Sequence, residues 1–151
     1  MKNTSARVLS AAAVALLIAI SAAAMTATEA IEQRKKEMEG VRDGMMALSA
    51  IAKKEQPFDA DVVRSNAEKI AGHLEEAAKL FPEGSDTGDA ETAAKPEIWA
   101  DRENFDKIMA SSHQAAVELQ SVTEQSAFPG ALGKLGNTCK SCHDLYKTAQ
   151  Q

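Results

Sequence analysis

Aromatic residues are scarce in this chain of 151 residues, of which they make up 4%. Strands favour aromatic and β-branched side chains, whereas the abundant alanine of this chain favours helices. No segment alternates apolar and polar residues over the length of a strand. The composition therefore predicts an all-α protein.

Positive charge is also in deficit, with 17 lysines and arginines against 22 acidic residues and a formal net charge of −5. Two of the positive charges, Lys2 and Arg7, belong to the N-terminal segment, so its removal would take the net charge from −5 to −7. Such an acidic surface argues against binding to nucleic acid or to anionic lipid. It fits brief contacts with partner proteins that carry basic patches.

No apolar run is long enough to cross a bilayer comfortably. The longest covers residues 8–20, after the basic residues Lys2 and Arg7, and is followed by small residues up to Ala24. This arrangement is typical of a secretory signal peptide. We expect cleavage after Ala24, with Ala27 as the second choice, which leaves one periplasmic domain over residues 25–151 and no stable membrane insertion. An uncleaved N-terminal anchor is the alternative.

Cysteine occurs only at Cys139 and Cys142, and His143 follows directly. Two thiols at i and i+3 share one face of a helix, and with an adjacent imidazole they suit covalent attachment of haem, each sulfur adding to one vinyl group. A thioredoxin-like pair would need a βαβ context, and a structural zinc site would need two more ligands. His73 and His113 stand alone and are expected at the surface. We predict one covalent haem c, held through Cys139 and Cys142, with His143 as an iron ligand.

Apolar residues recur at steps of three and four in four segments, which predicts four helices. The stripes cover residues 31–52, 63–81, 105–122 and 132–146. Asp59 is expected to cap the second helix, residues 85–95 to form a long surface loop, and Pro96 to begin a short turn that carries Trp99. Both cysteines fall on the apolar stripe of the last helix. The pattern predicts an antiparallel up-down-up-down four-helix bundle with haem c near the C-terminal helix.

Met38 is the candidate for the second axial ligand. His143 is expected about 10 Å from the end of the last helix, and Met38 about 15 Å from the start of the antiparallel first helix. These depths agree within a turn. A methionine that only fills the core is the alternative.

Arg34 lies one turn before Met38 on a stripe that is otherwise apolar or small. A guanidinium there needs an anion, which a haem propionate would supply, and Lys35 on its flank is expected to contribute. The alternative is an arginine that extends its head into water. Lys147 follows His143 by one turn and is expected either to pair with a propionate, to screen the histidine, or to be simply solvated.

Four short motifs together resemble the cytochrome c′ family, the class II c-type cytochromes. Residues 34–38 (RKKEM) resemble the family's arginine followed four residues later by the distal residue, and residues 138–144 (TCKSCHD) resemble its haem motif. Residues 56–59 (QPFD) and 96–99 (PEIW) resemble the turns before its second and third helices. The similarity covers nearly the whole chain after residue 24. It departs from the family at Lys147, where the family often has arginine; lysine keeps the positive charge but lacks the planar fork of a guanidinium.

The resemblance implies two branches that differ at residue 38. Low-spin members have methionine there and are six-coordinate electron carriers, whereas high-spin members have an apolar residue and are implicated in binding nitric oxide and carbon monoxide. Met38 resembles the low-spin branch. We therefore predict an electron-transfer protein with His143 and Met38 on the iron, which is not an enzyme, and keep a gas-binding protein as the alternative. Whether the chain is a monomer or a homodimer stays open.

Overall fold

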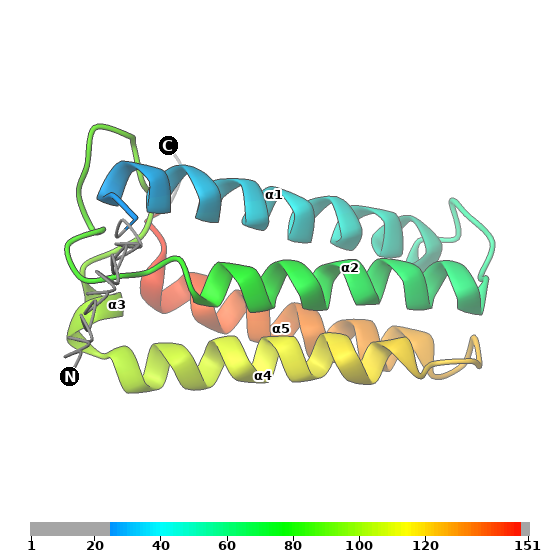
Figure 1. The fold of residues 1–151 in the computed structure, drawn as a ribbon. Helices are drawn as coiled ribbons and strands as arrows, with labels where there is room; N and C mark the ends of the chain where they lie inside the picture. The colour runs from blue at the N-terminus through cyan, green and yellow to red at the C-terminus, as the bar shows by residue number, and fades with distance from the viewer. Residues whose placement is uncertain (1–24, 149–151) are drawn as a thin grey trace, which may run out of the picture.

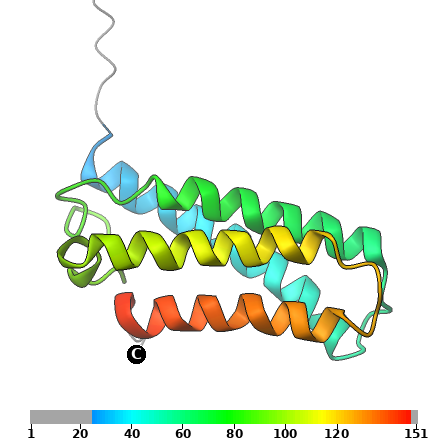
Figure 2. The same cartoon turned by 90° about the horizontal axis from the view of Figure 1, so that it is seen from below.

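Four long helices form an elongated antiparallel bundle in the computed structural model, which describes residues 25–148 (Figures 1 and 2). The helices of the described residues are α1 (Ala27–Ala52), α2 (Ala60–Ala78), the one-turn α3 (Glu97–Ala100), α4 (Arg102–Gln120) and α5 (Phe128–Tyr146). The chain runs up, down, up and down through α1, α2, α4 and α5 (Figure 1). The predicted all-α four-helix bundle is confirmed. The predicted signal peptide, residues 1–24, lies outside the described residues.

The helix starts follow from their capping residues. Thr26 and Glu29 form a capping box at the start of α1, in which each side chain accepts a hydrogen bond from the other's backbone. At α2 the carboxylate of Asp59 accepts from the backbone N–H of Asp61 and Val62, as the sequence predicts. The first helix ends at Ala52, where the chain turns through a left-handed residue, Lys54 (φ 63°).

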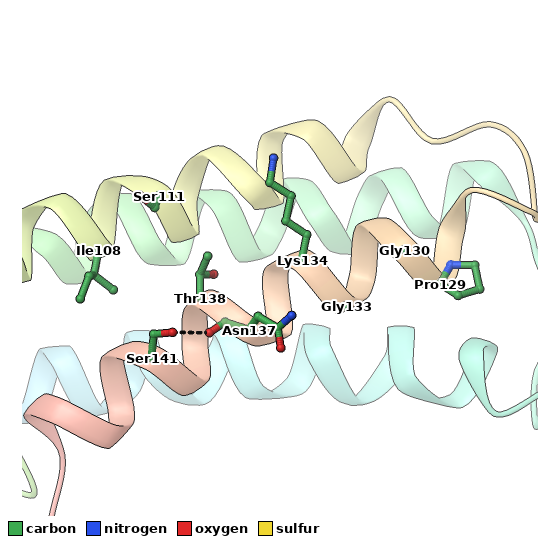
Figure 3. A pocket seen from close by; sticks show the side chains of 9 residues that line it. All are labelled: Ile108, Ser111, Pro129, Gly130, Gly133, Lys134, Asn137, Thr138 and Ser141. Carbon is green, nitrogen blue, oxygen red and sulfur yellow. Dashed lines mark hydrogen bonds between the residues drawn. The ribbon is translucent and has the colours of Figure 1, made fainter.

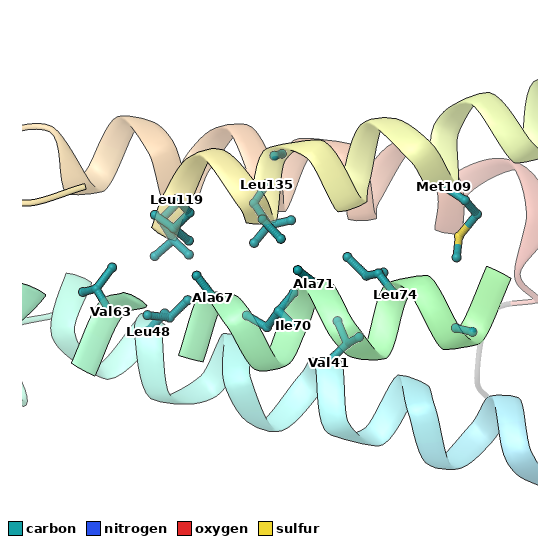
Figure 4. Close-up of a cluster of buried hydrophobic side chains, with 14 of the residues drawn as sticks. Val41, Leu48, Val63, Ala67, Ile70, Ala71, Leu74, Met109, Leu119 and Leu135 are labelled. Carbon is teal, nitrogen blue, oxygen red and sulfur yellow. The ribbon is translucent and has the colours of Figure 1, made fainter. Parts of the chain in front are cut away.

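Aliphatic side chains fill the middle of the bundle (Figure 4). Among them Leu48, Ile70, Leu119 and Leu135 are completely buried. The side chain of Ile70 in α2 packs directly against Gly44 of α1, where an added Cβ would lie 2.6 Å from Ile70 Cγ1. Only glycine fits there without a shift of the neighbouring side chain.

The helices do not contact one another equally. α1 packs extensively on α2, α2 on α4 and α4 on α5, whereas α1 and α5 contact each other only slightly. Contacts between helices therefore do not fill the seam between α1 and α5. Among the residues described, no helix combines the length and the hydrophobicity that crossing a bilayer requires.

The last helix ends at Tyr146, earlier than the sequence analysis assumed. Lys147 is extended and pairs with Ala94 of the long loop in an isolated antiparallel bridge. His143 therefore lies only about 4.5 Å from the end of α5, while Met38 lies about 16 Å from the start of α1. The expected agreement of these two depths is wrong, and the relation between the residues comes from the cavity described next.

Candidate functional site

A cavity of about 550 Å³ opens along the seam between α1 and α5. All six residues predicted for cofactor binding line it, three from α1 and three from α5: Arg34, Lys35, Met38, Cys139, Cys142 and His143. Residues of the long loop 79–96 and residues 147–148 also line it. Residues more than a hundred positions apart in the sequence thus meet in one cavity.

The two cysteines lie half-buried on the α5 wall of this cavity, and they are not joined in a disulfide. Burial raises the pKa of the Cys139 thiol. For Cys142, burial and then the neighbouring Cys139 raise the pKa to about 11. Both sulfurs are therefore protonated at neutral pH, and they stand one helical turn apart, as attachment to one porphyrin requires.

His143 comes from the last turn of α5 and lines the same cavity. Although His143 is exposed overall, partial loss of water around its ring lowers the pKa of the imidazole, the nearby charge of Lys147 lowers it further, and Asp144 opposes them. A lowered pKa keeps the ring neutral, and a neutral ring nitrogen is the form that can bind a metal. Lys147 is exposed and lines the cavity mouth.

The inner wall of the cavity is apolar and its mouth is charged. The inner side chains come from α1, α2, α3, α4 and the loop: Val41, Leu74, Phe81, Ile98, Phe105 and Met109. The charged side chains at the mouth are Lys35, Glu39, Arg42, Glu91 and Lys147. An apolar interior with a charged rim fits haem, whose ring is apolar and whose propionates are anionic.

Arg34 is 4% exposed, so the alternative that it extends into water is wrong. Its Nη1 donates to Leu80 O (3.3 Å) and Ser85 Oγ (3.1 Å), and its Nη2 donates to Ser85 O (2.7 Å) and Thr92 Oγ1 (2.8 Å). All four acceptors are neutral. Burial lowers the pKa of the guanidinium, and the charge of Asp86 counteracts this. The predicted contact between Arg34 and a propionate stays a prediction, with most of the guanidinium donors already used by the loop.

Aromatic side chains cover the rest of the Arg34 guanidinium. Its central carbon lies 5.0 Å from the Phe81 ring centre and 5.7 Å from that of Trp99. Cation–π attraction of this kind adds to the hydrogen bonds where a charge has lost its water. The charge of Arg34 is thus held in place beside the cavity by the protein itself.

Sequence reasoning missed Met109 of α4, which is buried and lines the cavity. The apolar stripe predicted over residues 105–122 runs through Phe105, Ile108 and Ser112, but Ile108 is only half-buried and faces another groove. The steps from Phe105 to Met109 and on to Ser112 are four and three, so an equally regular stripe through Met109 was available. The cavity therefore holds a second thioether besides Met38.

The two other histidines do not line the cavity. His73 is half-buried rather than fully at the surface, because its ring packs over Gly40 and its Nδ1 lies 2.7 Å from Glu37 Oε2. His113 is also half-buried. Within residues 25–148, no three histidine, cysteine or acidic side chains gather as a metal site would need.

A second hollow of about 620 Å³ lies as an open groove on the outer face of α4 and α5 (Figure 3). Gly130 and Gly133 form part of its floor, and an added Cβ at either would meet no atom within 4 Å. None of the predicted cofactor ligands lines this groove. The chemistry of the chain is therefore concentrated in the cavity between α1 and α5.

Comparison with known proteins agrees with this geometry. A family model described as Cytochrome C′ matches residues 29–147. A cytochrome c′ of Rhodopseudomonas palustris is 33% identical to this chain, and the match covers 87% of this chain and 90% of the relative. A cytochrome c-556 of Agrobacterium fabrum is 34% identical, and the match covers 85% of this chain and 87% of the relative. The solved structure of a cytochrome c′ from Rhodopseudomonas palustris superposes with a TM-score of 0.77 at 32% identity, covering 81% of this chain and 98% of that one.

Proposed function

We propose that this chain, which belongs to the cytochrome c′ family, is an electron-transfer protein of the periplasm. The family's covalent haem c is attached here through Cys139 and Cys142. In the proposed function, His143 is the proximal ligand and Met38 the distal ligand of the iron. The observation that supports it is the presence of Met38 and His143 in one cavity, on the two helices that flank the seam.

The haem supplies a ferric–ferrous couple, and the protein supplies ligands that keep their positions. Met38 and His143 belong to long helices that pack on α2 and α4, respectively. A neutral imidazole and a neutral thioether favour the ferrous form relative to two imidazoles. Since no bond in a substrate is made or broken, we propose no enzymatic activity.

A gas-binding protein is the second candidate, and family membership alone supports it better than electron transfer. Relatives named cytochrome c′ stand among the most similar ones, and the resemblance associates high-spin members with nitric oxide and carbon monoxide. The apolar inner wall would suit a diatomic gas beside the iron. The observation against this candidate is the thioether of Met38 in the same cavity.

Two matched variants distinguish these functions. Met38→Leu and Met109→Leu each remove one thioether from the cavity and keep a side chain of similar volume, so each is expected to cost less than about 1.5 kcal/mol of stability. We expect the parent and Met109→Leu to be low-spin, with the methionine-to-iron charge-transfer band in the ferric spectrum. Met38→Leu should be high-spin and bind carbon monoxide readily.

Two spectral results would contradict ligation of the iron by Met38. A high-spin parent would support the gas-binding candidate. A parent spectrum that is kept in Met38→Leu and lost in Met109→Leu would transfer the distal role to Met109.

The remaining parts of the proposed function concern place and partners. We propose that residues 1–24 are removed on export and that residues 25–151 form the periplasmic domain. We also propose redox partners with basic docking patches, in view of the net negative charge. Mass spectrometry of the secreted protein tests both the cleavage site and the covalent haem.

A further inference from the structure

We propose that residues 80–95, hereafter the brace, fix the separation of the two ligand-bearing helices, and that Ser85 and Thr92 are positioning residues for Met38. This inference rests on the proposed function in one respect, the ligation of iron by Met38. The brace itself is a property of the contacts described below.

The need for such an element follows from the helix contacts. α1 carries Met38 and α5 carries His143, yet these helices contact each other only slightly, because the cavity lies between them. Each is positioned by packing on its other neighbour, α2 or α4. Direct packing across the seam is therefore too sparse to set the separation of the two ligands.

The brace is attached to α1 chiefly through Arg34, one helical turn before Met38. Ser85 is completely buried and accepts two hydrogen bonds from the guanidinium, one at its hydroxyl and one at its carbonyl. Its hydroxyl in turn donates to Pro82 O at 2.8 Å, which fixes its orientation. A second attachment lies near the start of α1, where the backbone N–H of Asp89 donates to Thr28 Oγ1 (3.2 Å). Because hydrogen bonds to charged groups are stronger than neutral ones, the Arg34 attachment is the firmer of the two.

The other end of the brace is attached to the end of α5. The backbone N–H of Thr148 donates to Ala93 O (2.9 Å), and that of Lys95 donates to Tyr146 O (3.0 Å). The Lys95 ammonium also donates to Leu145 O (2.7 Å). These bonds begin two residues after His143, so they hold the part of α5 that carries the proximal ligand.

Thr92 joins the two attachments. Its hydroxyl accepts from Arg34 at 2.8 Å and from the backbone N–H of Ala94 at 3.1 Å. Ala94 is the residue that pairs with Lys147. Hydrogen bonds therefore join Arg34 of α1 to Thr92, and Thr92 to Ala94, while the residues on either side of Ala94 bond to the end of α5 through Thr148 N–H to Ala93 O and Lys95 N–H to Tyr146 O.

Ser85→Ala is the sharpest test, because Ser85 does not line the cavity and can affect the iron only through Arg34 and the brace. The matched control is Thr87→Ala, an exposed hydroxyl in the same segment. In the ferrous holoprotein, we expect Ser85→Ala to bind carbon monoxide about tenfold faster, the effect of losing one hydrogen bond to a charged group. Its methionine-to-iron band should weaken in the ferric state. Thr92→Val should act in the same direction, and Thr87→Ala should match the parent.

A purely structural role of Ser85 would give a different result. The free energy of unfolding would fall in Ser85→Ala, but the carbon monoxide rate and the ferric spectrum of the folded protein would equal those of the parent. That outcome would overturn the brace.

Failure of the proposed function is visible separately, in the parent. If the parent lacks the methionine-to-iron band, ligation by Met38 is refuted. The brace is then judged by the ratio of the carbon monoxide rates of Ser85→Ala and the parent, because a loosened α1 wall still opens the distal side. A ratio near ten supports the brace, and a ratio near one overturns it.

Discussion

Replacing Gly44 with alanine tests the close packing of α1 against the buried Ile70 of α2. The added Cβ would lie 2.6 Å from Ile70 Cγ1 and 3.0 Å from Ile70 Cδ1. Ile70 is completely buried, so its side chain cannot rotate into solvent. The helices α1 and α2 must therefore separate slightly, or Ile70 must leave its preferred rotamer.

Two effects of opposite sign determine the magnitude. Overpacking of a core costs about 1–3 kcal/mol, whereas alanine in place of glycine favours a helix by about 1 kcal/mol. Gly72 of α2 offers a matched control, because it is exposed and an added Cβ there meets no atom within 4 Å. The helix-propensity gain is common to both variants. The free energy of unfolding should therefore be lower in Gly44→Ala than in Gly72→Ala by about 1–3 kcal/mol.

Urea denaturation of the holoprotein, followed by circular dichroism, measures this difference. We expect Gly72→Ala to unfold at a higher urea concentration than the parent and Gly44→Ala at a lower one, with equal slopes in all three proteins. If Gly44→Ala gained as much stability as Gly72→Ala, the close packing at Gly44 would be refuted.

Two further changes have equally direct outcomes. Asp59→Ala removes the acceptor for the backbone N–H groups of Asp61 and Val62. The free energy of unfolding, measured by thermal denaturation, should therefore fall by about 1 kcal/mol. Asp59→Asn keeps an acceptor and should retain most of the stability. Cys142→Ser leaves one thiol for attachment, so we expect weak or absent haem retention during maturation, checked by mass spectrometry of the denatured protein. An unchanged covalent adduct in Cys142→Ser would contradict the assignment of the cysteines.

The periodicity of the sequence was sufficient to predict the helices, and to predict that both cysteines lie on the inward face of the last one. Apolar steps of three and four report which face of a helix is buried, Asp59 marks a helix start through its capping carboxylate, and Pro96 marks one through its fixed backbone angle. The haem motif was recognisable because all of its chemistry lies within five residues. The same periodicity did not distinguish Ile108 from Met109, since both fit regular steps around Phe105.

The partners of Arg34 could not be predicted from the sequence. They lie 46 to 58 residues further along the chain, mostly in a loop without periodicity, and two of its four contacts are to backbone carbonyls. Every residue has a backbone carbonyl, so the residue types do not show which carbonyl will accept a hydrogen bond from Arg34. The early end of α5 was missed for a related reason, because the pairing of Ala94 with Lys147 depends on where the loop returns in space.

The chain contains one tryptophan, Trp99, and its position makes it an internal optical probe. Its indole N–H donates to Pro82 O (2.9 Å), and its ring lies beside Phe81, which lines the cavity. Energy transfer to a tethered porphyrin should quench its fluorescence in the intact protein. Emission from this single indole would then increase when α3, which carries Trp99, separates from the prosthetic group, so opening of that end of the bundle can be followed without an attached dye.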